Sequence, residues 1–134
     1  MQTFELLTMV TFLTMYLGSA IRAIVAPDGY RAAEIAFYAS GKPALFELAG
    51  FLLTGVAFVF LVLHFILEPV QLAQSLLYAL VLLITLMMPF HFIRFYRERM
   101  THSLKKKSSA AYRSSGVKRI VIGAAIVLLP YIYG

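Results

Sequence analysis

Four stretches of this 134-residue sequence are almost free of charged residues, and each is long enough to form a membrane-spanning helix. They cover about residues 3–25, 44–67, 70–93 and 117–133. A hydrocarbon core about 30 Å thick requires roughly 20 apolar residues per helix, so the fourth stretch lies near the short limit. Only 13% of the residues are charged, whereas soluble domains carry about 25%. We predict an all-α integral membrane protein in which residues 1–134 form a single four-transmembrane-helix bundle.

The positive charges are confined to two of the segments that flank these stretches. All 12 Lys and Arg residues lie at or between the first and second stretches, or at or between the third and fourth. With four spans, both segments lie on the same side of the membrane, and the positive-inside rule assigns that side to the cytoplasm. We therefore expect both chain termini outside, in the inner (plasma) membrane of a prokaryotic cell.

Residues 28–41, in the first cytoplasmic loop, are too polar to span a membrane but contain two tyrosines and a phenylalanine. Asp28 is suited to cap the start of a helix, and Gly41 is suited to end it. We predict a short amphipathic helix in the cytoplasmic interface, where aromatic rings are favoured. A plain loop is the alternative, because the apolar period is imperfect.

The third stretch is expected to continue past Pro89 as a kinked helix and to lead into a basic cytoplasmic loop, residues 94–119. This loop has nine cations and one acid, Glu98, a net charge of +8. Its serine-rich middle has the composition of a linker. Each basic residue close to an anionic leaflet contributes about 1 kcal/mol to membrane binding. The residues predicted to contact anionic lipid headgroups are Arg94, Arg97, Arg99, Lys105, Lys106 and Lys107. Alternatively, the cluster only retains the loop in the cytoplasm.

Polar residues within the spans recur at steps of three and four, which places them on one face of each helix. Because lipid penalises such groups, these faces should point toward one another or toward a partner. Ordinary helix packing is the favoured interpretation, since Glu47 lies close enough to the membrane surface to reach it or to pair with Arg22. A polar pathway or ligand pocket is the alternative. This intramembrane polar stripe consists of Arg22, Glu47, Thr54, His64, Glu68, Gln74, Tyr78 and Thr85.

The sequence points to no metal site, cofactor or catalytic residue. It has no cysteine, which excludes disulfides, thiolate metal sites and iron–sulfur clusters. His64 and Glu68 lie four residues apart, with Glu5 on the same side, but two or three such ligands are weak support for a metal site. No zinc-protease, nucleophile-elbow or phosphate-loop motif is present. Nucleic acid is not an expected partner, because the cations adjoin apolar spans and lipid headgroups lie nearer.

We therefore expect a non-enzymatic membrane protein that acts as an accessory or scaffolding subunit, as a homo-oligomer or together with other membrane subunits. The main alternative is a small oligomeric transporter or channel that uses the polar stripe. A membrane enzyme, or a quinone-binding or lipid-binding protein that uses His64, Glu68 and Tyr78, is a third and weaker hypothesis. Whether other chains co-purify with the protein in mild detergent would separate the first hypothesis from the others.

The predicted orientation can be tested with introduced thiols, because the chain has no cysteine of its own. In intact cells, Gln2→Cys and Gln71→Cys should react with a membrane-impermeant maleimide. Ser40→Cys and Ser109→Cys should react only after the cells are permeabilised. Labelling of Ser109→Cys in intact cells would reverse the orientation.

Overall fold

A computed structural model describes residues 2–133 and places nearly all of them in helices. The chain is 89% helical, without a strand among the described residues, so the predicted all-α class is confirmed. Positions 1 and 134 of the predicted domain lie outside the described residues. The helices are α1 (Thr3–Val25), α2 (Pro27–Ser40), α3 (Leu45–Leu67), α4 (Ser75–Met87), α5 (Arg94–Lys105) and α6 (Ser109–Tyr133), and two 3-10 segments are η1 (Leu72–Gln74) and η2 (Met88–Phe92).

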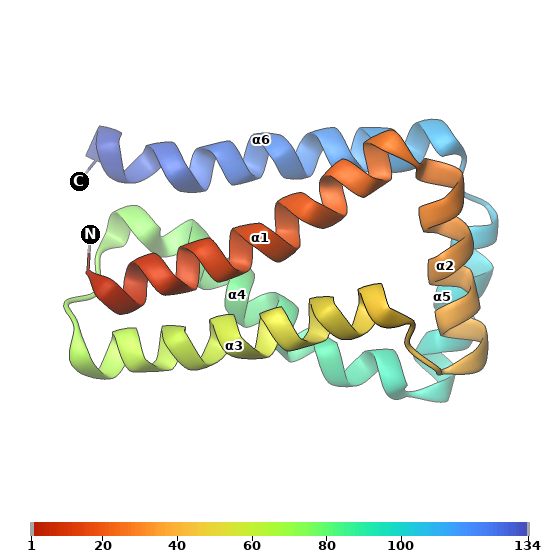
Figure 1. Ribbon diagram of the computed structural model, residues 1–134, viewed down its shortest axis with the longest axis horizontal. Helices are drawn as coiled ribbons and strands as arrows, with labels where there is room; N and C mark the ends of the chain where they lie inside the picture. The colour runs from red at the N-terminus through yellow and green to blue at the C-terminus, as the bar shows by residue number, and fades with distance from the viewer. Residues whose placement is uncertain (1, 134) are drawn as a thin grey trace.

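Four segments are long and apolar enough to cross a membrane, namely α1, α3, η1 to η2 with α4 between them, and α6. They extend along the long axis of the molecule, while α2 and α5 lie across one end (Figure 1). The described helices agree closely with the predicted stretches 3–25 and 44–67. A helix is also present at residues 27–40, where the amphipathic helix was predicted.

The third and fourth stretches differ from the prediction. Pro89 lies in η2, and the extended backbone of Ile93 then separates η2 from α5. Proline lacks an N–H donor and its ring clashes with the preceding turn, so the predicted continuous kinked helix is instead interrupted. The serine-rich segment is not a linker, because α6 begins at Ser109 rather than at Val117. Residues 94–119 are therefore mostly helical rather than a loop.

The four long segments share one apolar core. Its buried residues come from α1, α3, α4 and α6, and Phe12 of α1 stacks on Tyr16 with ring centroids 5.1 Å apart. Helix α1 is central, because it packs along both α3 and α6. The buried core residues are Phe12, Tyr16, Ala57, Leu61, Leu77, Tyr78, Val81 and Ile126.

A second cluster joins α2 and α5 at the end of the molecule where they lie. Phe37 and Tyr38 of α2 are buried there with Leu104 of α5. Gly41 ends α2 in a left-handed conformation with φ 71°, as its sequence position predicted. Asp28 does not cap α2, which starts instead with Pro27 in its first turn. The Asp28 carboxylate accepts a hydrogen bond from the hydroxyl of Ser109 at the start of α6.

The close packing of α6 on α1 depends on two glycines seven residues apart in α6. A Cβ atom on Gly116 would lie 2.7 Å from the carbonyl oxygen of Ala20, and one on Gly123 would lie 2.6 Å from a methyl carbon of Leu17. The obstacle at Gly116 is backbone, which cannot move without shifting a helix. These two glycines therefore allow α6 to approach α1 closely.

We predict that Gly116→Ala lowers the thermal stability of the purified protein. Alanine favours a helix over glycine by about 0.5–1 kcal/mol, but overpacking costs about 1–3 kcal/mol, so the clash should dominate. Gly55→Ala is the matched control, because no atom lies within 4 Å of its added Cβ, and it should be neutral or stabilising. Thermal melts followed by circular dichroism in detergent measure both. An unchanged melting temperature for Gly116→Ala would contradict the close approach of α1 and α6.

Candidate functional site

The structure divides the predicted polar stripe into two groups at opposite ends of the core. His64, Glu68 and Tyr78 come together at the end where α3 stops, whereas Arg22 and Glu47 lie at the end covered by α2. Along α3, the buried apolar residues Ala57 and Leu61 lie between the two groups. The stripe is therefore not a continuous row of polar contacts.

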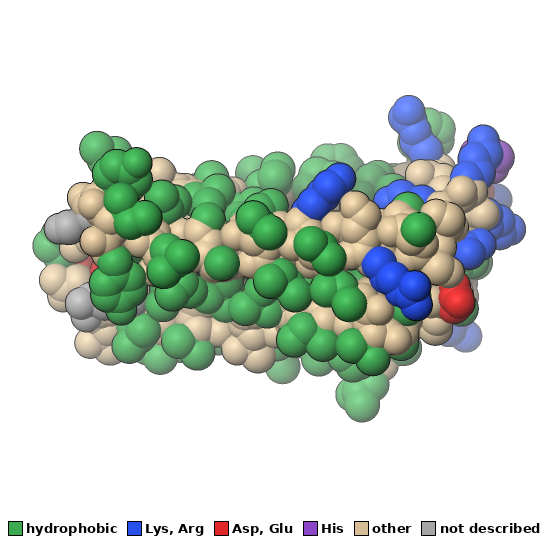
Figure 2. Space-filling view, turned by 90° about the horizontal axis from the view of Figure 1, so that it is seen from above, with side chains coloured by type: hydrophobic (Ala, Val, Ile, Leu, Met, Phe, Trp, Pro, Cys, Tyr) green, Lys and Arg blue, Asp and Glu red, His purple; other side chains and the backbone are tan. Residues whose placement is uncertain are grey.

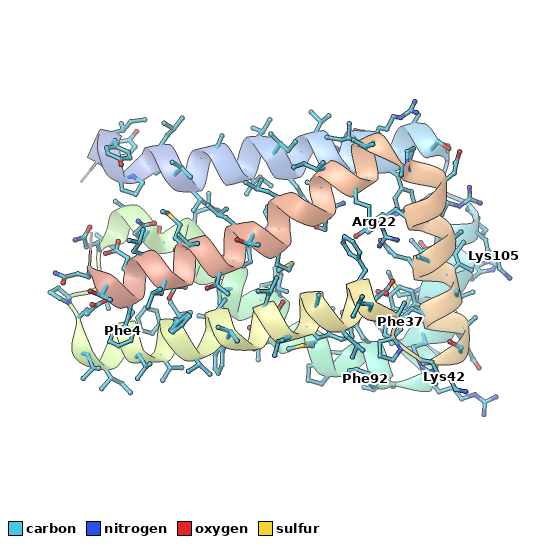
Figure 3. The ribbon with its side chains drawn as sticks, viewed as in Figure 1. Phe4, Arg22, Phe37, Lys42, Phe92 and Lys105 are labelled. Atoms are coloured by element: carbon cyan, nitrogen blue, oxygen red, sulfur yellow. The ribbon has the colours of Figure 1, made fainter. Side chains whose placement is uncertain are left out.

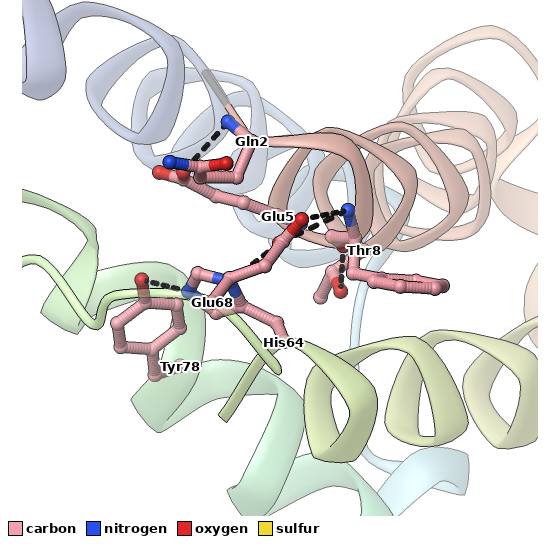
Figure 4. Close-up of polar contacts among 7 residues, drawn as sticks. Gln2, Glu5, Thr8, His64, Glu68 and Tyr78 are labelled. Carbon is pink, nitrogen blue, oxygen red and sulfur yellow. Dashed lines mark hydrogen bonds and ion pairs between the residues drawn. The ribbon is translucent and has the colours of Figure 1, made fainter. Parts of the chain in front are cut away.

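At the first end, the side chains form a chain of hydrogen bonds that connects three helices (Figure 4). His64 Nδ1 lies 2.9 Å from Glu68 Oε1, and His64 Nε2 lies 2.7 Å from the Tyr78 hydroxyl. The Glu68 carboxylate also accepts hydrogen bonds of 3.1 Å from the backbone N–H groups of Phe4 and Glu5. These N–H groups belong to the first turn of α1, where backbone N–H groups have no acceptor within the helix. This Glu68 network, formed by His64, Glu68, Tyr78 and the Phe4 and Glu5 N–H groups, thus ties α3 to α1 and α4.

The surroundings of Glu68 favour its charged form. Partial desolvation opposes ionisation, but the hydrogen bonds from His64 and from the Phe4 and Glu5 N–H groups outweigh it and lower the pKa of Glu68. A carboxylate at a helix N-terminus is also stabilised by the helix dipole. Within residues 2–133, no cluster of three or more His, Asp or Glu side chains is placed to hold a metal ion.

The other predicted stripe residues make fewer contacts. The Thr54 hydroxyl donates a 2.7 Å hydrogen bond to the Gly50 carbonyl within α3. Gln74 is buried, and both polar atoms of its amide lack a protein partner among the described residues. The hydroxyl of Thr85 is likewise buried without a partner there. Thr54 lines the same cavity as Arg22 and Glu47, whereas Gln74 and Thr85 belong to neither polar group.

At the second end, α1, α3 and α2 surround a partly enclosed cavity of about 700 Å³. Its walls are mainly apolar and aromatic, including Met15, Phe46 and Leu53. Five Arg, Glu and His side chains also line it. They are Arg22, Glu34, Glu47, His91 and Arg119.

Arg22 projects from the C-terminal end of α1 into the angle between α1 and α2 (Figure 3). Its guanidinium carbon lies 4.2 Å from the centre of the Phe46 ring and 5.0 Å from the centre of the Tyr30 ring. Such cation–π contacts attract the guanidinium charge to the faces of the aromatic rings. In residues 2–133 it makes no hydrogen bond and no ion pair, so the suggested Arg22–Glu47 pair is not formed. One carboxylate oxygen of Glu47, Oε2, is buried and also lacks a hydrogen-bond partner in that range.

Three further cavity residues were not singled out by the sequence analysis. Arg119 donates a 2.6 Å hydrogen bond to the Ser19 hydroxyl. Burial raises the pKa of the Glu34 carboxyl, although Tyr30 and the Arg119 charge partly oppose this. His91 donates from Nδ1 to the Met87 carbonyl at 2.9 Å, which directs its other nitrogen away from that helix. No sequence pattern joined these residues, because they lie on α2, α6 and η2.

A smaller cavity of about 220 Å³ adjoins the large one on the side of α5 and α6. Both cavities are lined by Tyr30, Glu34 and Arg119. Lys107 and Ser115 contribute polar groups to the smaller one. The site therefore consists of a large apolar space with a polar boundary toward the basic end of the molecule. That arrangement suits a molecule with an apolar part and a polar part.

The Glu68 network predicts that the stability of the folded protein depends on pH. Because the folded state lowers the pKa of Glu68, the ionised carboxylate stabilises the folded protein. This stabilisation should be complete above the ordinary pKa of 4.5 and should be lost as the pH falls through the lower pKa of the folded state. Thermal melts between pH 7 and about pH 3 should show a smaller loss of stability for Glu68→Gln than for the wild type, since the amide has no charge to lose. Glu98→Gln is the control, because the Arg94–Glu98 pair is largely exposed. Identical pH profiles for Glu68→Gln and wild type would refute this role.

No protein-family model, curated protein or solved structure matches this chain.

Proposed function

We propose that the protein is inserted in the prokaryotic inner membrane as a bundle of four spanning helices. Two observations support this proposal. The four long segments have the required length and hydropathy, and they present large apolar side chains on their outer surface. Examples are Leu52, Leu86 and Ile132, which are 69%, 69% and 67% exposed. Hydrocarbon chains of lipid, or other membrane subunits, would cover these side chains.

The end with α2 and α5 is proposed to face the cytoplasm. Lys and Arg side chains gather there, as Figure 2 shows, and the positive-inside rule then gives the orientation. In this arrangement α2 and α5 lie in the interface, where Arg99 and Lys105 to Lys107 are exposed and available to anionic headgroups. Arg94 pairs with Glu98 at 3.0 Å, and the Arg97 guanidinium packs against Gly41.

In this proposed membrane orientation, the proposed function is to bind one amphiphilic lipid molecule. The large cavity carries this proposal, because about 700 Å³ lies within the usual range of about 300–1,000 Å³ for ligand sites. Its apolar wall would hold hydrocarbon, and its ionisable groups lie at the membrane surface in the proposed orientation. No catalytic group is required, so the protein is proposed to act non-enzymatically, alone or as an accessory subunit in a homo-oligomer or hetero-oligomer.

A transporter or channel has less support. The two polar groups of the stripe are separated on α3 by Ala57 and Leu61, which are fully buried in the apolar core. A solute path through one chain would have to open this core.

Filling the cavity should abolish lipid binding. Gly18 and Gly50 line the cavity, and a Cβ at either position meets no atom closer than 4.0 Å, so Gly18→Leu combined with Gly50→Leu should fold and occupy the space. Native mass spectrometry of wild type should show one amphiphile retained per chain, and the double variant should retain much less.

Gly55→Leu is the matched control, because Gly55 has equal space on α3 but does not line the cavity. It should retain the amphiphile. Equal retention by the filled variant and the control would contradict the proposed function, as would a wild-type protein that retains none.

A further inference from the structure

We propose that the polar boundary of the cavity recognises a phospholipid whose phosphodiester binds Arg22 and whose headgroup donates a hydrogen bond to Glu47. This inference rests on the proposed amphiphile-binding function and specifies the headgroup. It follows from three properties of Arg22 and Glu47: their hydrogen-bonding groups without partners, their charges and their position along the spanning helices.

The free positions on Arg22 are the N–H groups at the edge of its guanidinium. Phe46 and Tyr30 contact this group through their rings, and its N–H groups make no hydrogen bond within the described part of the chain. An edge with several parallel N–H donors matches the paired oxygens of a phosphate group. An arginine that is held between aromatic rings and has no acceptor among the described residues is thus available to an anionic oxygen.

Glu47 presents the opposite kind of group. Its Oε2 atom is buried without a hydrogen-bond partner inside residues 2–133, and leaving a buried charged acceptor unpaired is unfavourable. Since Glu47 lines the same cavity as Arg22, a ligand can satisfy both. The required ligand carries a donor, either an ammonium or a hydroxyl group, beside its phosphate. Phosphatidylethanolamine and phosphatidylglycerol have this combination, whereas phosphatidylcholine has no donor.

The site has equal numbers of Arg and Glu side chains, which limits the negative charge that a ligand can carry. Arg22 and Arg119 are balanced by Glu34 and Glu47 when all four are ionised, so a ligand with several negative charges would be poorly compensated. Arg119 is already engaged with Ser19. Arg22 therefore remains the cation available to the ligand.

The depth of the two side chains matches that of a lipid headgroup. Arg22 lies in the last turn of α1, and Glu47 lies in the first turn of α3. Both are at the α2 end of the spans, the proposed cytoplasmic surface. Met15, Leu53 and Ile84 line the cavity farther from the ends of these helices, where acyl chains would lie. A lipid of the inner leaflet would thus enter with its usual orientation.

The test uses the full chain, purified in detergent and depleted of lipid. It is titrated with phosphatidylethanolamine, phosphatidylglycerol, phosphatidylcholine and diacylglycerol of identical acyl chains, and bound molecules are counted by native mass spectrometry. We expect one bound lipid, with either donor-bearing phospholipid about tenfold or more tighter than diacylglycerol, as expected for a charge-assisted hydrogen bond. Phosphatidylcholine should bind more weakly than the preferred donor-bearing lipid.

Substitutions of Arg22 and Glu47 test the two proposed lipid contacts separately. Arg22→Gln should remove the preference for phospholipids over diacylglycerol, and Arg22→Lys should restore part of it because the charge remains. Arg113→Gln removes an exposed cation at the same end and should have no effect. Glu47→Gln distinguishes the two donors. It should weaken the binding of a lipid with an ammonium headgroup, which needs the carboxylate charge, more than the binding of a lipid with a hydroxyl headgroup. Thermal melts verify that each variant is folded.

Two outcomes overturn the headgroup assignment. One is equal binding of diacylglycerol and phospholipids that Arg22→Gln leaves unchanged, in which case amphiphile binding itself still stands. The other is displacement of the lipid by millimolar inorganic phosphate, which would indicate a site for free phosphate. If none of the four lipids binds, including diacylglycerol, the proposed function fails as well.

Discussion

Helix α1 is held by a different partner at each of its ends, and the remainder of the structure follows from this arrangement. At its start, the Glu68 carboxylate binds the free N–H groups of Phe4 and Glu5 and so fastens α1 to α3. Toward its other end, Gly116 lets α6 approach the backbone of Ala20. Figure 1 shows α1 lying close to α3 at its N-terminus and close to α6 at its C-terminus. The two helices α1 and α3 therefore diverge toward α2, and the cavity lies in that region.

The polar groups at the two ends differ in how well they are satisfied. Around Glu68, the hydrogen bonds to Phe4, Glu5 and Tyr78 join α3 to α1 and α4, and His64 is completely buried. Buried polar groups that are fully paired rigidify a structure, so these residues have a structural role. Near α2, by contrast, the Oε2 atom of Glu47 is buried without a hydrogen-bond partner within the described residues, and the Arg22 guanidinium contacts the rings of Phe46 and Tyr30. A buried carboxylate oxygen without a partner is unfavourable, and the proposed ligand would supply that partner.

The short helix α2 contributes to the polar boundary of the cavity, and α5 packs on α2 at the same end of the molecule. Helix α2 begins directly after α1 with Pro27, so Tyr30 and Glu34 are brought to the end of the spans, beside Arg22 and Arg119. The break at Pro89 and Ile93 turns α5 across the same end, where it packs on α2. The break between α1 and α2 therefore brings polar side chains to the cavity, and the break at Pro89 and Ile93 places α5 against α2.

The sequence by itself determined which segments are long apolar helices, because hydropathy and length depend only on local composition. It also determined where α2 ends, since Gly41 tolerates a left-handed conformation, and which face of α3 is buried, since Thr54, Ala57, Leu61 and His64 recur at helical spacing. The tertiary structure alone decided that α6 extends back to Ser109, because Gly116 is favourable there only through its contact with α1. It also decided that Arg22 contacts aromatic rings rather than Glu47, and that Glu34 and Arg119 share a cavity. These outcomes depend on distances between helices that are remote in sequence, and no local pattern of residues encodes such distances.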